Sequence, residues 1–168
     1  MDAKLRTCLD FTISKEGGIT TDSGGLTKRG ISQKAYPHLD IANLTDVEIE
    51  RIYENDYYNK VGATQLSPPL AVLVFDTAVN CGVARTVKWL QIIINMMTGA
   101  GLATDGIMGI KTLQAIEHAD PKSMALLIFH QRLFHYYSLR KSQPEAFGGW
   151  VGRVADLLRV VGCWGHCS

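Results

Sequence analysis

The chain has 168 residues, of which 46% are hydrophobic and 20% are charged, and its formal net charge is +1. This length supports one substantial hydrophobic core but is short for two ordinary domains, so we expect one compact globular unit. The longest nearly apolar runs, around 70–75 and 90–97, fall well short of the ~20 residues of a membrane span, and no transmembrane segment is predicted. The basic residues form no clustered stripe like that of nucleic-acid-binding proteins, which argues against a nucleic-acid partner.

The N-terminal residues carry charge and are not followed by the apolar stretch of a secretory signal peptide, so we expect synthesis in the cytoplasm. Three of the four cysteines fall in or beside segments with a helical pattern, which favours free thiols over a disulfide framework. Cys163, His166 and Cys167 form a single Cys-x3-Cys element near the C-terminus. Because no second pair with metal-ligand spacing accompanies it, we expect neither a metal nor a cofactor.

The first predicted helix spans about 5–16, because apolar residues recur there at three- and four-residue spacing. It is expected to end at the glycine pair 17–18, which would place Glu16 in its last turn. The following segment, 18–31, is rich in Gly, Thr, Ser and Asp. We therefore expect a loop that contains at most a small β-hairpin.

Helical patterns continue along the rest of the chain. The run Thr45-Asp-Val-Glu48 is a capping box that begins a helix to about residue 58, and Ser67-Pro68 marks the next start. The further helices are predicted over 69–80, 84–98, 110–118, 121–140 and 149–161. With little strand signal and no internal repeat, the fold is predicted to be mainly α, and no phosphate loop or nucleophile elbow is present.

A glutamate and an aspartate accompany two glycine pairs in the segment 15–31, and this is the strongest functional signal. Glycine pairs let the backbone turn tightly and come close to a ligand, which makes Gly25 a candidate contact. Cleavage of a glycosidic bond needs a carboxylic acid that donates a proton to the leaving oxygen, usually with help from a second carboxylate. The negative end of a helix disfavours an ionised carboxylate, so Glu16 is suited to be this acid.

Asp22 and Thr27 are the candidates to complete the chemistry. Asp22 could face Glu16 across the bend, hold a water molecule or stabilise the cationic sugar of the transition state, and Thr27 could orient that water. Glu16 and Asp22 also have structural interpretations. A glutamate before two glycines often marks a helix end, and an aspartate before a glycine pair often forms a turn.

Taken together, these elements resemble glycoside hydrolase family 108, whose members are phage endolysins and related bacterial muramidases. The resemblance begins with Glu16-Gly-Gly and with the run 22–31, Asp-Ser-Gly-Gly-Leu-Thr-Lys-Arg-Gly-Ile. It continues through the segments 76–82, 90–91, 105–112 and 147–153, so it covers nearly the whole chain. The latter half is similar to the predicted peptidoglycan-binding region that accompanies this family.

The resemblance implies a lysozyme-like, helix-rich fold and hydrolysis of the β-1,4 bond between N-acetylmuramic acid and N-acetylglucosamine, with Glu16 as the catalytic acid. It suggests a catalytic region at 1–86, a helical region that resembles a peptidoglycan-binding domain at 87–162, and a tail at 163–168. The partner would be the glycan strands of peptidoglycan, and a monomer is favoured. The enzyme would act on the cell wall after release from the cytoplasm, in phage lysis or in wall remodelling.

Further residues are candidates for substrate binding. Asp76 and Asn80 share one face of a helix and could bind sugar, although we favour the interpretation that they brace the segment 18–31. Trp150 and Arg153 could contact an acyl-sugar, or they could be a packing tryptophan and a surface arginine. Lys28 could attract the carboxylates of the muramic lactyl group or stem peptide, or it could be a solvated loop charge.

Two alternatives to a muramidase stay open. The interval between Glu16 and Asp22 is shorter than expected for the family, which would suit a non-catalytic peptidoglycan-binding or secretion-accessory protein that kept the fold. A lytic transglycosylase would also use one glutamate, but it would leave anhydromuramic ends in place of reducing ends.

Overall fold

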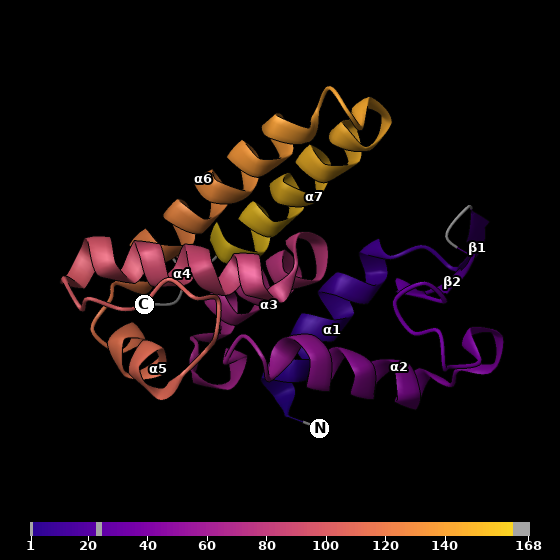
Figure 1. Ribbon diagram of the computed structural model, residues 1–168, viewed down its shortest axis with the longest axis horizontal. Helices are drawn as coiled ribbons and strands as arrows, with labels where there is room; N and C mark the ends of the chain where they lie inside the picture. The colour runs from indigo at the N-terminus through magenta and orange to yellow at the C-terminus, as the bar shows by residue number, and fades with distance from the viewer. Residues whose placement is uncertain (1, 23–24, 163–168) are drawn as a thin grey trace.

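The computed structural model describes residues 2–22 and 25–162 and confirms the predicted mainly α fold (Figure 1). Within these residues the α-helices are α1 (Ala3–Lys15), α2 (Asp46–Tyr53), α3 (Pro68–Cys81), α4 (Val83–Thr98), α5 (Ile110–Ile116), α6 (Pro121–Leu139) and α7 (Pro144–Gly162). Three shorter helical turns are η1 (Ile41–Asn43), η2 (Glu54–Tyr58), which has π geometry, and η3 (Ala63–Gln65).

The helix α3 forms the centre of the core. Every residue from 70 to 78 is buried, and the helices α1, α4, α6 and α7 all pack against it. A helix that is apolar all round is suited to such a position, because it has no face that needs water. The one charged residue in this buried run is Asp76, and its carboxylate has to find its partners inside the protein.

The segment 18–32 forms a small antiparallel sheet in the order β1 (Ile19–Asp22), β2 (Gly25–Lys28) and β3 (Ile31–Ser32). The strand β3 extends the hairpin that was predicted, and its two residues are too few to show an alternating pattern. The turn between β2 and β3 has positive φ angles at Arg29 (47°) and Gly30 (82°), and this folds the chain back sharply.

The end of α1 differs from the prediction in a way that matters for the site. Glu16 is not in the last helical turn, because the helix ends at Lys15 and Glu16 has an extended backbone with φ −81° and ψ 136°. Its N–H still donates to the carbonyl oxygen of Ile13. Glu16 is therefore the first residue of the connection to β1, and its side chain is placed between the helices and the sheet.

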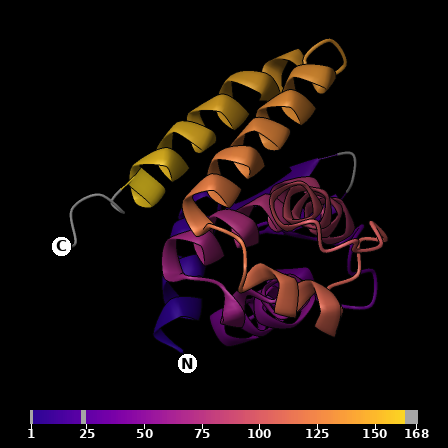
Figure 2. The same cartoon turned by 90° about the vertical axis from the view of Figure 1, so that its left-hand side faces the viewer.

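The helices α6 and α7 form a long hairpin that projects from the body (Figures 1 and 2). The prediction started α7 at residue 149, but the helix begins at Pro144 and continues through the glycines at 148, 149 and 152. An added Cβ at each of these glycines would meet open space, so the helix does not require glycine at these positions. No helix in the described part of the chain is long and apolar enough to cross a membrane.

Cys8 and Cys81 are buried free thiols, as predicted. Burial raises the pKa of Cys8 to about 12, so this thiol stays protonated and serves packing. The predictions for Cys163, His166 and Cys167 lie outside the described residues.

Two glycine substitutions should change stability in opposite directions. In Gly30→Ala the positive φ is retained at a cost, and the new Cβ meets the Tyr53 hydroxyl and lies 2.9 Å from Oε2 of Glu16, so we expect the free energy of unfolding to fall by more than ~1 kcal/mol. Gly148→Ala should raise it by roughly 0.5–1 kcal/mol, because alanine is the better helix former. Urea denaturation measures both, and a stable Gly30→Ala protein would contradict the tight turn.

Candidate active site

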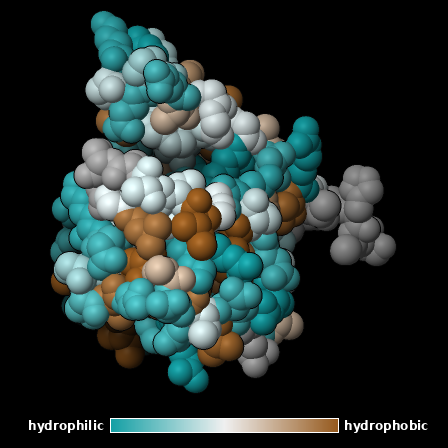
Figure 3. Space-filling view, turned by 90° about the vertical axis from the view of Figure 1, so that its right-hand side faces the viewer, coloured by the Kyte–Doolittle hydropathy of each residue, from teal (hydrophilic) through white to brown (hydrophobic). Residues whose placement is uncertain are grey.

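Glu16 lies at the edge of a cleft of about 580 Å³ between the end of α1, the end of α3 and the first half of α7. Asn80, Trp150 and Arg153 line the same cleft. In Figure 3 the surface steps inward below the projecting end of the α6–α7 hairpin. The structure therefore brings together four of the residues that the sequence singled out.

A single arginine joins the candidate acid to the core. Nη1 of Arg153 donates to Oε1 of Glu16 at 2.8 Å, and its Nε donates to Oδ1 of Asp76 at 2.9 Å. The side chain of Arg153 is 10% exposed, that of Glu16 is 20% exposed and that of Asp76 is 0% exposed. Burial alone would lower the pKa of Arg153, but the hydrogen bonds and charges of Asp76 and Glu16 raise it. Arg153 is thus a fixed cation, and it holds one oxygen of Glu16 in place.

A second arginine, Arg132 of α6, also bonds Asp76. Nη1 of Arg132 donates to Oδ2 of Asp76 at 2.7 Å, and the hydroxyl of Thr12 donates to Oδ1 at 3.2 Å. Arg132 is fully buried, and its Nε donates to the Tyr136 hydroxyl. Two arginines surround this one buried carboxylate, and Arg153 also bonds Glu16 on the cleft side. The carboxylate of Glu16 is therefore part of a charge network that runs into the core.

This network differs from what the sequence suggested. Asp76 and Asn80 were expected to brace the segment 18–31, but Asp76 bonds Thr12, Arg132 and Arg153, and the Asn80 amide donates to the carbonyl oxygen of Asp76 at 2.9 Å. The helix end was expected to disfavour the ionised form of Glu16. The structure instead places the Arg153 guanidinium against Glu16. A contact between residues this far apart in sequence leaves no mark in local spacing.

The turn between β2 and β3 lies against the other side of Glu16. A Cβ added at Gly30 would be 2.9 Å from Oε2 of Glu16, so only a glycine lets the backbone approach this closely. The Tyr53 hydroxyl donates to the carbonyl oxygen of Arg29 at 2.8 Å and fixes this turn. Burial, with a smaller contribution from the charge of Glu16, raises the pKa of Tyr53. Sequence reasoning missed Tyr53, since no spacing links it to the motif.

Trp150 forms an aromatic wall of the cleft. Its ring stacks on that of Tyr136 with centroids 5.0 Å apart and an interplanar angle of 19°. Because Tyr136 in turn accepts a hydrogen bond from Arg132, the charge network also supports the tryptophan. Trp150 therefore combines the two interpretations, since it packs on its own hairpin and also lines the cleft.

The remaining candidates lie in the sheet, outside the residues that line the cleft. Thr27 is in β2 opposite Thr20 and Ser32, and Gly25 begins β2 with φ 97°. The ammonium of Lys28 donates to the carbonyl oxygens of Ala42 (3.0 Å) and Leu44 (2.7 Å), so its charge holds the segment around η1. Asp22 ends β1, and its side chain is not described. The proposed roles of these four residues stay predictions.

Comparisons with known proteins agree with the resemblance in the sequence. Residues 9–82 match the family model described as Glycosyl hydrolase 108, and residues 85–155 match the Predicted Peptidoglycan domain. The solved structure of SagA from Brucella abortus superimposes with a TM-score of 0.81 and 26% identity, covering 98% of this chain and 97% of that one. No curated protein sequence matches significantly. Glu16 and Asp76 fall in the first matched region and Arg153 in the second, so both regions contribute to the site.

Removal of the negative charge of Asp76 should destabilise the folded protein. In Asp76→Asn two buried arginines lose their shared anionic partner, and we expect the free energy of unfolding to fall by about 3–5 kcal/mol. The matched control is Glu50→Gln, which removes an acid that pairs with the exposed Arg6 and should cost less than ~1 kcal/mol. Urea denaturation compares the two, and equal losses would show that the Asp76 network is not the stabilising element.

Proposed function

We propose that this lysozyme-like peptidoglycan hydrolase cleaves the β-1,4 bond between N-acetylmuramic acid and N-acetylglucosamine, with Glu16 as the general acid. The match of residues 9–82 to the glycosyl hydrolase 108 model and of residues 85–155 to the peptidoglycan domain supports this proposal. The observation that carries the proposal is the position of Glu16. It is a carboxylate held by Arg153 in a cleft, it remains partly exposed, and it lies between the helices and the sheet.

The other carboxylates near the cleft are less suited to donate a proton. Asp76 is fully buried and surrounded by Arg132, Arg153 and Thr12, so a substrate could not reach it. Asp156 lines the cleft, but its hydrogen bond from Lys15 holds its pKa below the usual range, with a further contribution from Arg159.

The bond from Arg153 gives Glu16 a fixed orientation and a defined partner after the reaction. Proton transfer to the glycosidic oxygen leaves Glu16 as a carboxylate, and the guanidinium stabilises this product form. Because Arg153 is itself held by Asp76, it need not reorganise when the negative charge appears. Arg153 therefore acts as the positioning residue for the acid.

A second group has to stabilise the sugar cation or deliver water, and Asp22 and Thr27 are our candidates. Both are in the antiparallel pair β1–β2, in which Thr20 faces Thr27. Trp150 and Asn80 would bind sugar on the helical side of the cleft, and Gly25 and Lys28 would meet the substrate from the sheet. The mechanism would need no metal or cofactor.

We place the action of this enzyme on the cell wall after release from the cytoplasm. A role in phage lysis and a role in wall remodelling both agree with a peptidoglycan hydrolase.

The acid role is tested by Glu16→Gln, which keeps the size and the hydrogen-bonding oxygen but removes the transferable proton. We expect the rate of release of reducing ends from purified sacculi to fall by about 100-fold or more. The control Glu145→Gln changes an exposed acid in the first turn of α7, outside the cleft, and should keep the wild-type rate. A melting temperature near that of wild type would show that Glu16→Gln is folded. Undiminished hydrolysis by this variant would overturn the assignment.

A further inference from the structure

A second cleft, of about 710 Å³, lies between α5 and the loop that connects α4 to α5. In Figure 1 this part of the molecule is at the left, whereas the sheet next to Glu16 is at the right. The residues that line it include Gln91, Asp105, Ile107, Ile110, Lys111 and His118, none of which lines the cleft of Glu16. The proposed catalytic chemistry makes no use of this second cleft.

The loop wall of this cleft is fixed by two amide side chains of α4. Gln91, which is buried, donates to Oδ1 of Asp105 at 2.9 Å and to the carbonyl oxygen of Ile107 at 3.0 Å, and it accepts from the N–H of Gly106 at 2.9 Å. Asn95 bonds both the N–H (2.6 Å) and the carbonyl oxygen (2.8 Å) of Leu102. A surface loop held this firmly is a preorganised wall, because binding a ligand would cost little ordering entropy.

The helix wall presents polar groups that have no partner within the described residues. Lys111, Gln114 and His118 occur at spacings of three and four along α5 and its end, so they follow one face of the helix, and all three are exposed. No hydrogen bond or ion pair in the described part of the chain involves these three side chains. They are therefore free to bind a ligand that enters the cleft.

The composition of the cleft indicates the chemistry of this ligand. Ile107 and Ile110 are 67% and 73% exposed and offer apolar contact, while Lys111 offers a cation. The hydrogen bond from Gln91 lowers the pKa of Asp105, so an anion faces the same space. No Trp, Tyr or Phe side chain is among the described lining residues, whereas sugar rings commonly pack on aromatic faces such as that of Trp150. Apolar contacts beside both signs of charge fit a short zwitterionic peptide better than a glycan.

We propose that this second cleft binds the peptide stem of peptidoglycan, with Lys111 on a carboxylate, Asp105 facing the amine of the diamino acid, and Ile107 and Ile110 against alanine methyl groups. This inference rests on the proposed function, because it takes the ligand from the same polymer. A stem bound here would anchor the wall while the glycan occupies the cleft of Glu16. Two contacts with one polymer would increase the effective concentration of the glycan at the catalytic site.

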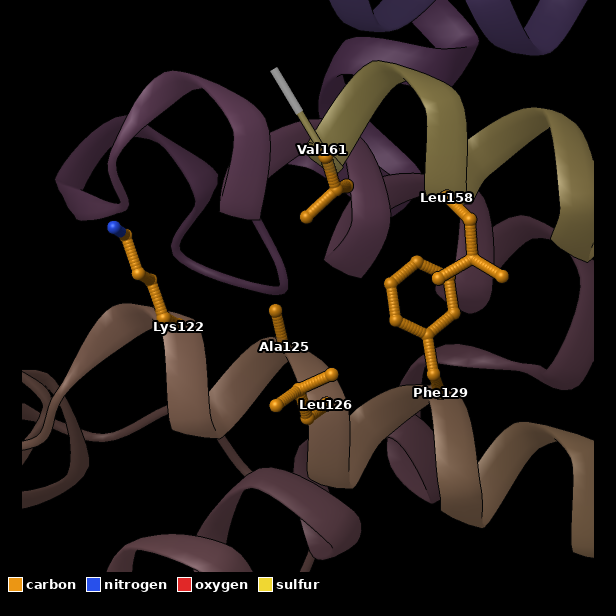
Figure 4. Close-up of a pocket in the computed structure, with 7 residues that line it drawn as sticks. Lys122, Ala125, Leu126, Phe129, Leu158 and Val161 are labelled. Carbon is orange, nitrogen blue, oxygen red and sulfur yellow. The ribbon is translucent and has the colours of Figure 1, made fainter. Parts of the chain in front are cut away.

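A third hollow serves as a contrast. It lies between α6 and α7 and is lined mainly by apolar side chains such as Leu126, Phe129, Leu158 and Val161, with Lys122 at its edge (Figure 4). Without an acidic group or an array of polar donors among its described lining residues, it does not fit a zwitterionic peptide. Lys122 therefore provides a matched control, because it is an exposed lysine beside a different hollow.

The test is an NMR titration of the wild-type protein with the synthetic tetrapeptide L-Ala-γ-D-Glu-meso-diaminopimelyl-D-Ala, and in parallel with chitotetraose. We expect the peptide to shift the amide signals of 100–107 and 110–118 in a saturable way, and chitotetraose to leave them unchanged. Lys111→Ala should raise the dissociation constant of the peptide about two- to fivefold, as for the loss of one exposed charged contact, whereas Lys122→Ala should not change it.

Two results would overturn the proposal: no saturable shift at millimolar peptide, or equal affinities of wild type and Lys111→Ala. Release of reducing ends from sacculi is measured on the same proteins, so that the two proposals can fail separately. Peptide binding without hydrolysis by wild type would remove the proposed function and keep this site. Hydrolysis without peptide binding would remove this site alone.

Discussion

The structure depends on one buried carboxylate, Asp76, at the centre of the most apolar helix of the chain. A charge at this depth is tolerated only when it is paired and hydrogen-bonded, and here Arg132, Arg153 and Thr12 supply the bonds. Arg153 also bonds Glu16 through its Nη1. The requirement to neutralise a buried charge therefore places the candidate catalytic acid at the surface end of a network whose other end is in the core.

This arrangement explains why the two halves of the chain form one unit. Asp76 and Glu16 come from the half that matches the glycosyl hydrolase model, and both arginines come from the half that matches the peptidoglycan domain. The site exists only when α6 and α7 pack against α3. On the opposite side, Gly30 lets the turn of the sheet approach Glu16, so that the acid lies between the helices and the sheet.

The sequence predicted the helices well, since apolar periodicity, the capping box at 45–48 and the prolines are local signals. It predicted α7 too short, because the glycines at 148, 149 and 152 resemble a helix break although the helix continues through them. Glu16 could be selected from the glycine-rich motif, but its partner could not, because the contact with Arg153 spans 137 positions of sequence. Arg132 was missed for the same reason: nothing local marks an arginine on an apolar helix as buried.

If the protein hydrolyses peptidoglycan at Glu16, the chemical identity of the released ends will show it. We would digest purified sacculi in water enriched in ¹⁸O and analyse the released fragments by mass spectrometry. Hydrolysis breaks the glycosidic bond with one water molecule, so the account predicts reducing muramic ends that each carry one heavy oxygen, formed by wild type and not by Glu16→Gln. Anhydromuramic ends without heavy oxygen would contradict hydrolysis, and labelled ends formed equally by the variant would contradict the role of Glu16.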